Sequence, residues 1–182
     1  DKERKLDKED GTLYRAIVAR GNYLAQDRTD IQFAVKELAR RMSDPSEEDW
    51  TALKRLGRYL IGNLRYVQEF PYQGNGGEIT VWTDTDYAGC LRTRKSTSGG
   101  IVQLGMHTIK GWSTTQSVVA LSSGEAEYYG MVRGAATGLG IKAVMEDLGL
   151  AGEIRLKTDA SAAYGIAHRM GLGKVRHLET CQ

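Results

Sequence analysis

The sequence predicts an α/β fold: a mixed sheet flanked by helices and preceded by a small helical segment. Three observations lead to this prediction. In the first third of the sequence, apolar residues recur every three to four positions. From residue 64 onward, short runs alternate between polar and apolar residues and are separated by glycine-rich turns. These predicted strands are followed by a long helix, another strand and a short helix. That order of elements is typical of a mixed sheet with helices packed against it.

Composition narrows the class of protein. The chain has 182 residues, of which 41% are hydrophobic and 26% charged, so it can form a core and is too apolar to be disordered. No apolar run approaches the roughly 20 residues of a membrane helix, so we expect no membrane segment. A formal net charge of +2 permits nucleic-acid binding without arguing for it. The two cysteines, Cys90 and Cys181, have no metal-ligand spacing and favour a reducing, intracellular compartment.

The N-terminal part divides into two segments. Residues 1–10 are nearly all charged and are predicted to be a mobile lead-in, followed by a helical connection segment over residues 11–63. Its first helix, over residues 13–25, has Leu13, Ile17 and Leu24 at helical spacing, with Tyr14 and Val18 alongside. A second begins near residue 30 with Thr29 or Asp30 as N-cap. Ser46 and Asp49 have capping-box spacing at the start of a third helix, which Gly62 ends.

The remaining residues, 64–182, are predicted to form the sheet domain. Strands are expected over 64–70 and 78–83, followed by a hairpin over 100–113 that turns at Gly105 and Met106. A long helix over residues 122–148 ends at Gly149, and a strand over 154–158 and a short helix over 160–168 follow. The connection at 73–77 is glycine-rich and is predicted to be a turn or linker.

Three carboxylates stand out in this second part. Asp84 and Asp159 each follow a predicted strand, and parallel neighbours would bring both to the carboxyl edge of the sheet. The alternative is that each only caps the turn or helix that follows it. Glu127 begins the apolar stripe of the long helix, continued by Met131, Ala135, Gly138, Ile141, Met145 and Leu148. Glu125 is explained by capping-box spacing from Ser122, whereas Glu127 has no such explanation.

Such a cluster of oxygen ligands would suit a hard cation. Carboxylates favour Mg²⁺ or Mn²⁺, and the cluster lacks the cysteine or histidine that would favour zinc. Two such ions about 3.5–4 Å apart can activate water and stabilise the leaving oxygen in phosphodiester cleavage.

Several stretches resemble a known family. Residues 83–90 (TDTDYAGC), 93–99 (TRKSTSG) and 119–128 (VALSSGEAEY) are similar to the ribonuclease H domain of copia-type LTR retrotransposons. Upstream, residues 14–18 (YRAIV), 28–31 (RTDI) and 56–60 (LGRYL) resemble the stretch that joins reverse transcriptase to ribonuclease H in that family. The resemblance covers nearly the whole chain after the charged start, and implies a ribonuclease-H-like sheet.

The resemblance also implies a function. It places the catalytic and metal-binding carboxylates at Asp84, Glu127 and Asp159, which would hold two Mg²⁺ or Mn²⁺ ions. It places nucleic-acid contacts at Arg94 and Lys95, for which the alternative is a solvated approach to the hairpin. The implied activity is cleavage of the RNA strand of an RNA–DNA hybrid. The implied partners are that hybrid, the reverse transcriptase portion of a parent polyprotein and a larger assembly, in a cytoplasmic particle or the nucleus.

The C-terminal edge departs from the family pattern. There the ribonuclease H pattern continues with another strand and a final helix that carries a fourth acid, whereas this sequence ends at Gln182. We therefore expect a domain truncated at its C-terminal edge. The competing hypothesis is a catalytically inactive truncated or domesticated copy that serves as a structural or binding component.

Overall fold

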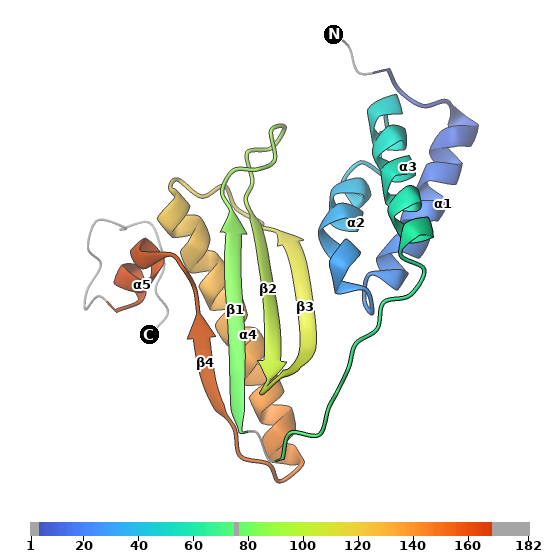
Figure 1. The fold of residues 1–182 in the computed structure, drawn as a ribbon. Helices are drawn as coiled ribbons and strands as arrows, with labels where there is room; N and C mark the ends of the chain where they lie inside the picture. Colours follow the sequence, from blue (N-terminus) through green and yellow to red (C-terminus); the bar gives the residue numbers. More distant parts are fainter. Residues whose placement is uncertain (1–3, 75–76, 169–182) are drawn as a thin grey trace. The chain divides into compact units, whose positions relative to one another are not determined.

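The computed structural model describes residues 4–74 and 77–168, which fall into two compact units. The first consists of Asp1–Pro71, which contains the helices α1 to α3, together with Trp112–Thr114. The second consists of Tyr72–Gly111 and Thr115–Gln182 and contains most of the sheet (Figure 1). The main division between the two units falls at 71/72. The domain boundary expected at 63/64 stays a prediction. Residues 169–182, where we expected truncation, lie outside the described residues. Within the described ranges, no helix has the length and apolar character needed to cross a bilayer.

The helical unit contains α1 (Lys8–Leu24), the short 3₁₀ helix η1 (Thr29–Ile31), α2 (Gln32–Ala39) and α3 (Glu47–Gly62). The capping box of α3 is confirmed: the Ser46 hydroxyl accepts from the Asp49 N–H, and the Asp49 carboxylate accepts from the Ser46 N–H. Residues 8–10, expected in the charged lead-in, instead form the first turn of α1. Asp7 caps this turn by accepting from the Asp10 N–H, and acidic residues favour a helix N-terminus.

The buried face of α1 differs from the predicted one. Tyr14 and Val18 are fully buried, whereas Leu13, Ile17 and Leu24 are at least one-third exposed. Tyr14 can be buried because its hydroxyl donates to the Leu38 carbonyl oxygen at 2.8 Å. The core of the unit consists of residues from all three α-helices and the turn before α2: Tyr14, Val18, Ala25, Ile31, Val35, Leu38, Leu53 and Leu56.

An ion pair replaces the expected N-cap of α2. The Arg28 guanidinium donates to both carboxylate oxygens of Asp30, at 2.9 and 2.7 Å, and to the Asn63 carbonyl oxygen at 3.1 Å. This pairing lowers the pKa of Asp30. α2 follows η1 directly and has Ile31 at its N-cap position, so it has no side-chain cap. The strand expected over residues 64–70 is absent, although the structure describes all of them. Tyr66 in this stretch instead bonds through its hydroxyl to Thr29 at 2.9 Å.

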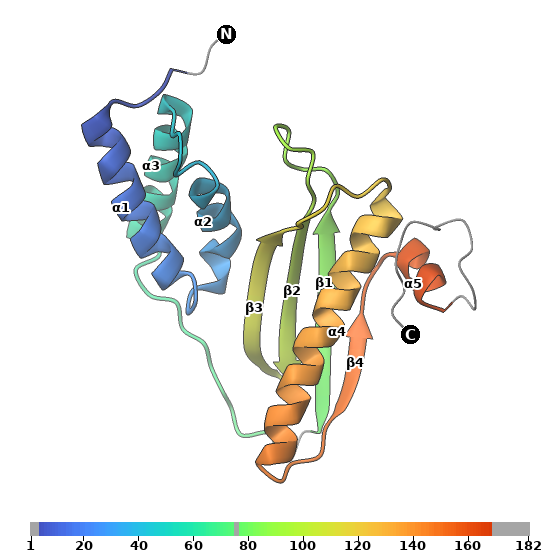
Figure 2. The ribbon, with the colours of Figure 1, turned by 180° about the vertical axis from the view of Figure 1, so that it is seen from behind.

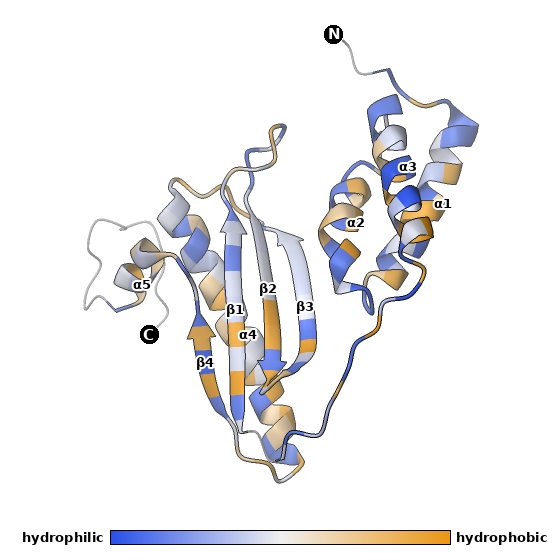
Figure 3. Cartoon of the chain, in the orientation of Figure 1, coloured by the Kyte–Doolittle hydropathy of each residue, from blue (hydrophilic) through white to orange (hydrophobic). Residues whose placement is uncertain are grey.

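The sheet unit confirms the predicted fold class. Its strands are β1 (Glu78–Asp86), β2 (Thr97–Leu104), β3 (His107–Thr115) and β4 (Glu153–Lys157), in the order β3-β2-β1-β4. β1 pairs antiparallel with β2 and parallel with β4, which is the mixed pattern of a ribonuclease-H-like sheet. Apolar residues are interspersed with polar ones along β1 and β4 (Figure 3). The β2–β3 hairpin turns at the predicted position, where Gly105 has φ +56°.

Among the described residues, the unit also contains two helices, α4 (Ser123–Asp147) and α5 (Ser161–Ala167). α4 runs across one face of the sheet (Figure 2). The predicted stripe on α4 is only partly right, because Met131, Gly138 and Met145 are buried but Leu148 is 71% exposed. Three glycines four residues apart, Gly130, Gly134 and Gly138, lie close to the sheet, opposite Thr85, Thr83 and Val81.

These glycines lead to a prediction about stability. A Cβ at position 134 would clash with Thr83 and lie 3.1 Å from Leu156 Cδ1, whereas a Cβ at position 140 would meet nothing within 4 Å. Both Gly134→Ala and Gly140→Ala gain the same helix propensity, about 0.5–1 kcal/mol. We therefore expect Gly134→Ala to be less stable than Gly140→Ala by about 1–3 kcal/mol, the usual cost of overpacking. Urea unfolding of the two variants measures the difference, and equal midpoints would contradict the close packing of α4.

Candidate metal centre

Strand pairing brings Asp84 and Asp159 to the same edge of the sheet. β1 and β4 are parallel neighbours, as predicted, and Trp82 pairs with Lys157. Asp84 and Asp159 each lie two residues beyond this pair in the same chain direction. Asp84 is still within β1, where it pairs with Gly99 of β2, so it does not follow the strand end as expected. Asp159 lies between the end of β4 and the start of α5.

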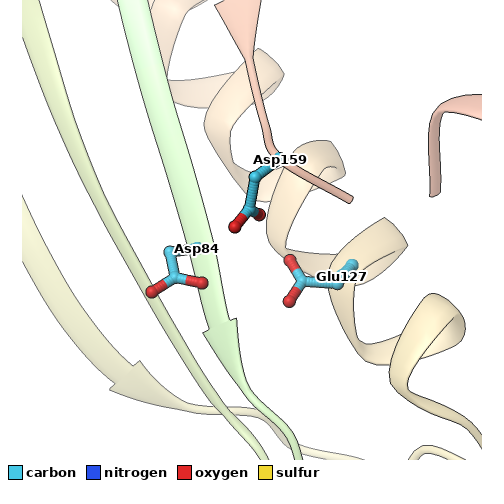
Figure 4. A group of neighbouring side chains, drawn as sticks. All are labelled: Asp84, Glu127 and Asp159. Atoms are coloured by element: carbon cyan, nitrogen blue, oxygen red, sulfur yellow. The ribbon is translucent and has the colours of Figure 1, made fainter. Parts of the chain in front are cut away.

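Glu127, near the start of α4, completes the group. One carboxylate oxygen from each of Asp84, Glu127 and Asp159 lies within 4.8 Å of the others. The three side chains point toward one another from a strand, a helix and a loop (Figure 4). Asp84 and Asp159 are exposed and Glu127 is partly buried, so the group is open to solvent on one side. The predicted convergence of the carboxylates is confirmed, and the cluster could hold a metal ion.

Among the three carboxylates, Glu127 has a pKa that is shifted from its ordinary value. Burial, followed by the charges of Asp84 and Asp159, raises the pKa of Glu127 to about 6. The nearby N–H and hydroxyl of Thr85 act in the opposite direction without cancelling the rise. Glu127 Oε2 is buried with no hydrogen-bond partner among the described residues. A cation would provide the missing partner and relieve the repulsion among the three charges.

Glu125, two residues earlier, has a different role. Its side chain is buried, and its Oε2 accepts from the Leu121 N–H at 2.9 Å. The Ser122 hydroxyl accepts from the Glu125 N–H at 3.2 Å, as expected for the N-cap. In the predicted capping box the Glu125 carboxylate would accept from the Ser122 N–H. It accepts instead from the N–H one residue earlier, and this hydrogen bond at the start of α4 explains its position.

Capping does not account for the two aspartates. α5 has Ala160 at its cap position and no side-chain cap, so Asp159 does not cap it. Asp84 Oδ1 accepts from the adjacent Thr85 N–H at 2.8 Å, which orients the carboxylate within the strand rather than ending a turn.

The predicted nucleic-acid contacts lie in the connection between β1 and β2. Arg94 is exposed, with φ 55°, and its N–H donates to the Cys90 carbonyl oxygen at 2.7 Å. Lys95 is partly buried, and its ammonium donates to the Ser117 carbonyl oxygen at 2.6 Å. Lys95 thus has a structural partner, whereas the Arg94 side chain extends into solvent. Their contact with nucleic acid stays a prediction.

A cavity of about 500 Å³ lies beside Asp84 and Asp159. Gly99 and Gly100 leave space over β2, and the adjoining wall includes Trp82. The Lys157 ammonium lies over the Trp82 ring, 4.3 Å from its centroid. We did not predict Trp82 and Lys157 from the sequence, because only the β1–β4 register places them together.

The shifted pKa of Glu127 predicts a pH-dependent stability. Between its ordinary value of 4.5 and about 6, the folded state binds more protons than the unfolded one, so stability falls as pH rises through this window. Glu127→Gln removes this cost and, after discounting for partial exposure, should stabilise the metal-free chain by about 1 kcal/mol at about pH 7.5. The gain should vanish at about pH 4.5.

Urea unfolding in EDTA at the two pH values measures this effect. Glu125→Gln is the matched control, and should be less stable than wild type at the higher pH because it weakens the bond to the Leu121 N–H. A Glu127→Gln variant that gains no stability at the higher pH would show that the cluster is not repulsive.

Comparison with known proteins finds relatives among transposon polyproteins. The chain is 42% identical over 119 residues to the retrovirus-related Pol polyprotein from transposon RE2 of Arabidopsis thaliana, a match over 65% of this chain and 8% of that protein. It is 39% identical over 141 residues to the corresponding polyprotein from transposon RE1, a match over 78% of this chain and 10% of that protein. The chain thus spans about a tenth of the length of these relatives.

A shorter relative is also found. The chain is 40% identical over 101 residues to secreted RxLR effector protein 161 of Plasmopara viticola, a match over 56% of this chain and 70% of that protein. No protein-family model matches the chain, and neither does any solved structure.

Proposed function

Because the chain belongs to the retrovirus-related Pol polyproteins of copia-type transposons, we propose that its sheet unit is a metal-dependent ribonuclease H. Its substrate would be the RNA strand of an RNA–DNA hybrid formed during reverse transcription. The observation that carries the proposal is the convergence of Asp84, Glu127 and Asp159 within 4.8 Å at one edge of the sheet. The helical unit would connect this domain to the reverse transcriptase portion of the polyprotein.

The residues present fit a hard divalent cation. All three donors are carboxylate oxygens, and the buried Glu127 Oε2 has no other partner among the described residues. These are the ligands that Mg²⁺ or Mn²⁺ prefers. When bound, two such ions would supply activation of the attacking water and stabilisation of the leaving 3′-oxygen.

Each carboxylate would contribute in its own way. The hydrogen bond from the Thr85 N–H orients Asp84, so its position is set before the ligand arrives. Glu127 projects from a helix packed against the sheet, and its partial burial limits competition from water. Asp159 lies on the loop after β4 and is exposed to solvent, so it would remain accessible to an incoming ion. Selectivity for RNA would come from contacts to the 2′-hydroxyl groups, which DNA lacks.

A cleavage assay tests this proposal. The chain is incubated with an RNA–DNA hybrid labelled on the RNA strand, in Mg²⁺, Mn²⁺ or EDTA, with the matched DNA duplex as control substrate. We expect cleavage of the RNA strand with either metal, none in EDTA and none of the DNA duplex. Cleavage that persists in EDTA, or a hybrid that stays intact with both metals, would count against the proposed activity.

A second candidate is a catalytically inactive copy that acts as a structural or binding component of a larger assembly. The match to 70% of a protein named as a secreted effector favours it, because related sequence then occurs outside the long polyproteins. This alternative predicts that the chain is folded but inert in the assay above, and that substitution of Asp84 changes neither stability nor hybrid binding.

A further inference from the structure

Gln116 lies where three elements of the sheet unit meet. It follows the last residue of β3 and is only 9% exposed. Its Nε2 donates to the Ser98 hydroxyl of β2 at 2.9 Å and to the Ala126 carbonyl oxygen of α4 at 2.8 Å. Its backbone N–H donates to the Ser96 carbonyl oxygen at 2.8 Å. One buried amide therefore connects the start of α4 to the sheet.

The chemistry of the partners determines how this amide is oriented. A backbone carbonyl oxygen only accepts hydrogen bonds, so the group that faces Ala126 must be the NH₂ of Gln116. Its Oε1 is then left buried with no hydrogen-bond partner among the described residues. An unpaired buried oxygen costs stability, so filling the core does not by itself explain a glutamine here.

The position of Ala126 links this anchor to the metal centre. Ala126 is joined by a peptide bond to Glu127, whose carboxylate lies within 4.8 Å of those of Asp84 and Asp159. Without a cation, the repulsion among these like charges favours movement of Glu127 and the start of α4 away from the sheet. The bonds from Gln116 oppose that displacement, because Ser98 pairs directly with Thr85, the residue after Asp84.

We propose that Gln116 is a positioning residue that holds Glu127 at metal-binding distance from Asp84 and Asp159. The inference rests on the proposed function, since it concerns the same metal centre. Gln116 touches neither the metal nor the substrate in this scheme; it acts through the Ala126–Glu127 peptide. Removing its NH₂ should therefore weaken metal binding, as loss of an outer-shell partner does, by about tenfold.

Mn²⁺ binding by the full chain, followed by electron paramagnetic resonance of the free ion, provides the test. Gln116→Met keeps the length of the side chain and removes both donors. Gln103→Met is the matched control, because Gln103 is a partly buried glutamine of β2 whose side chain accepts from Trp82 Nε1. We expect Gln116→Met to raise the Mn²⁺ dissociation constant about tenfold, and Gln103→Met to leave it within twofold of wild type.

A double-mutant cycle separates positioning from a general loss of stability. If Gln116 acts through Glu127, then Gln116→Met should weaken Mn²⁺ binding much less in a Glu127→Gln background than in wild type. Equal losses in both backgrounds, or unchanged binding by a folded Gln116→Met chain, would overturn the inference.

Two further outcomes have to be distinguished: a variant that does not fold and a wild-type chain that does not bind Mn²⁺. If Gln116→Met does not fold, Gln116→Asn, which keeps the amide but shortens its reach, replaces it in the same comparison. Failure of both variants to fold would make Gln116 a folding residue and overturn the positioning role. A wild-type chain that binds no Mn²⁺ would instead refute the metal centre of the proposed function.

Discussion

Asp84→Asn is expected to abolish cleavage of the RNA–DNA hybrid and to leave hybrid affinity nearly unchanged. The substitution keeps the shape of the side chain and its bond from the Thr85 N–H, but removes a charge from the group that would hold the metal. Affinity for the hybrid should come mainly from basic side chains on phosphates. We expect the rate to fall by at least about a thousandfold, comparable to the loss of other central catalytic groups.

Single-turnover cleavage and filter binding measure the two quantities separately. Asp86→Asn is the matched control: Asp86 also lies in β1, but it is outside the cluster of three carboxylates. It should retain activity within a few-fold of wild type. If both variants cleave equally well, Asp84 is not a metal ligand, and if Asp84→Asn also loses hybrid binding, its effect is not confined to the metal centre.

The second large effect is a loss of activity in acid. Glu127 must be ionised to bind a cation, and its pKa lies at about 6 because of burial and the neighbouring aspartates. At limiting Mg²⁺, cleavage should therefore fall by about tenfold for each pH unit below that value. Above the pKa of about 6, Glu127 is ionised, and its titration causes no further change in the cleavage rate.

The metal concentration distinguishes this cause from acid unfolding. Because protons and metal compete for the same carboxylate, raising the Mg²⁺ concentration should move the acid limb to lower pH. Circular dichroism across the same range controls for unfolding. An acid limb that does not move with Mg²⁺, or a rate that stays flat down to about pH 5 at limiting metal, would contradict the role assigned to Glu127.

Local signals in the sequence were reliable where neighbouring residues decide the structure. The capping box of Ser46 and Asp49, the hairpin turn at Gly105 and the N-cap at Ser122 each depend on contacts within a few positions of the chain. Apolar spacing was less reliable. It favoured Leu13 and Ile17 in α1, because spacing does not show that the hydroxyl of Tyr14 finds a carbonyl partner on another helix.

The order of the elements from residue 78 onward and the three carboxylates of the candidate centre could be predicted from the sequence, whereas the strand expected over residues 64–70 was wrong. Strand alternation, helix caps and motif residues are properties of short stretches, so they can be read without coordinates. The three-dimensional arrangement sets how close those carboxylates lie and raises the pKa of Glu127, because burial and charge are contributed by β1, α4 and the loop after β4. It also decided the glycine contact between α4 and β1 and the anchor at Gln116. Glycine has no side chain, so it does not contribute to an apolar pattern. The role of a buried amide cannot be predicted until the carbonyl group that it binds is known.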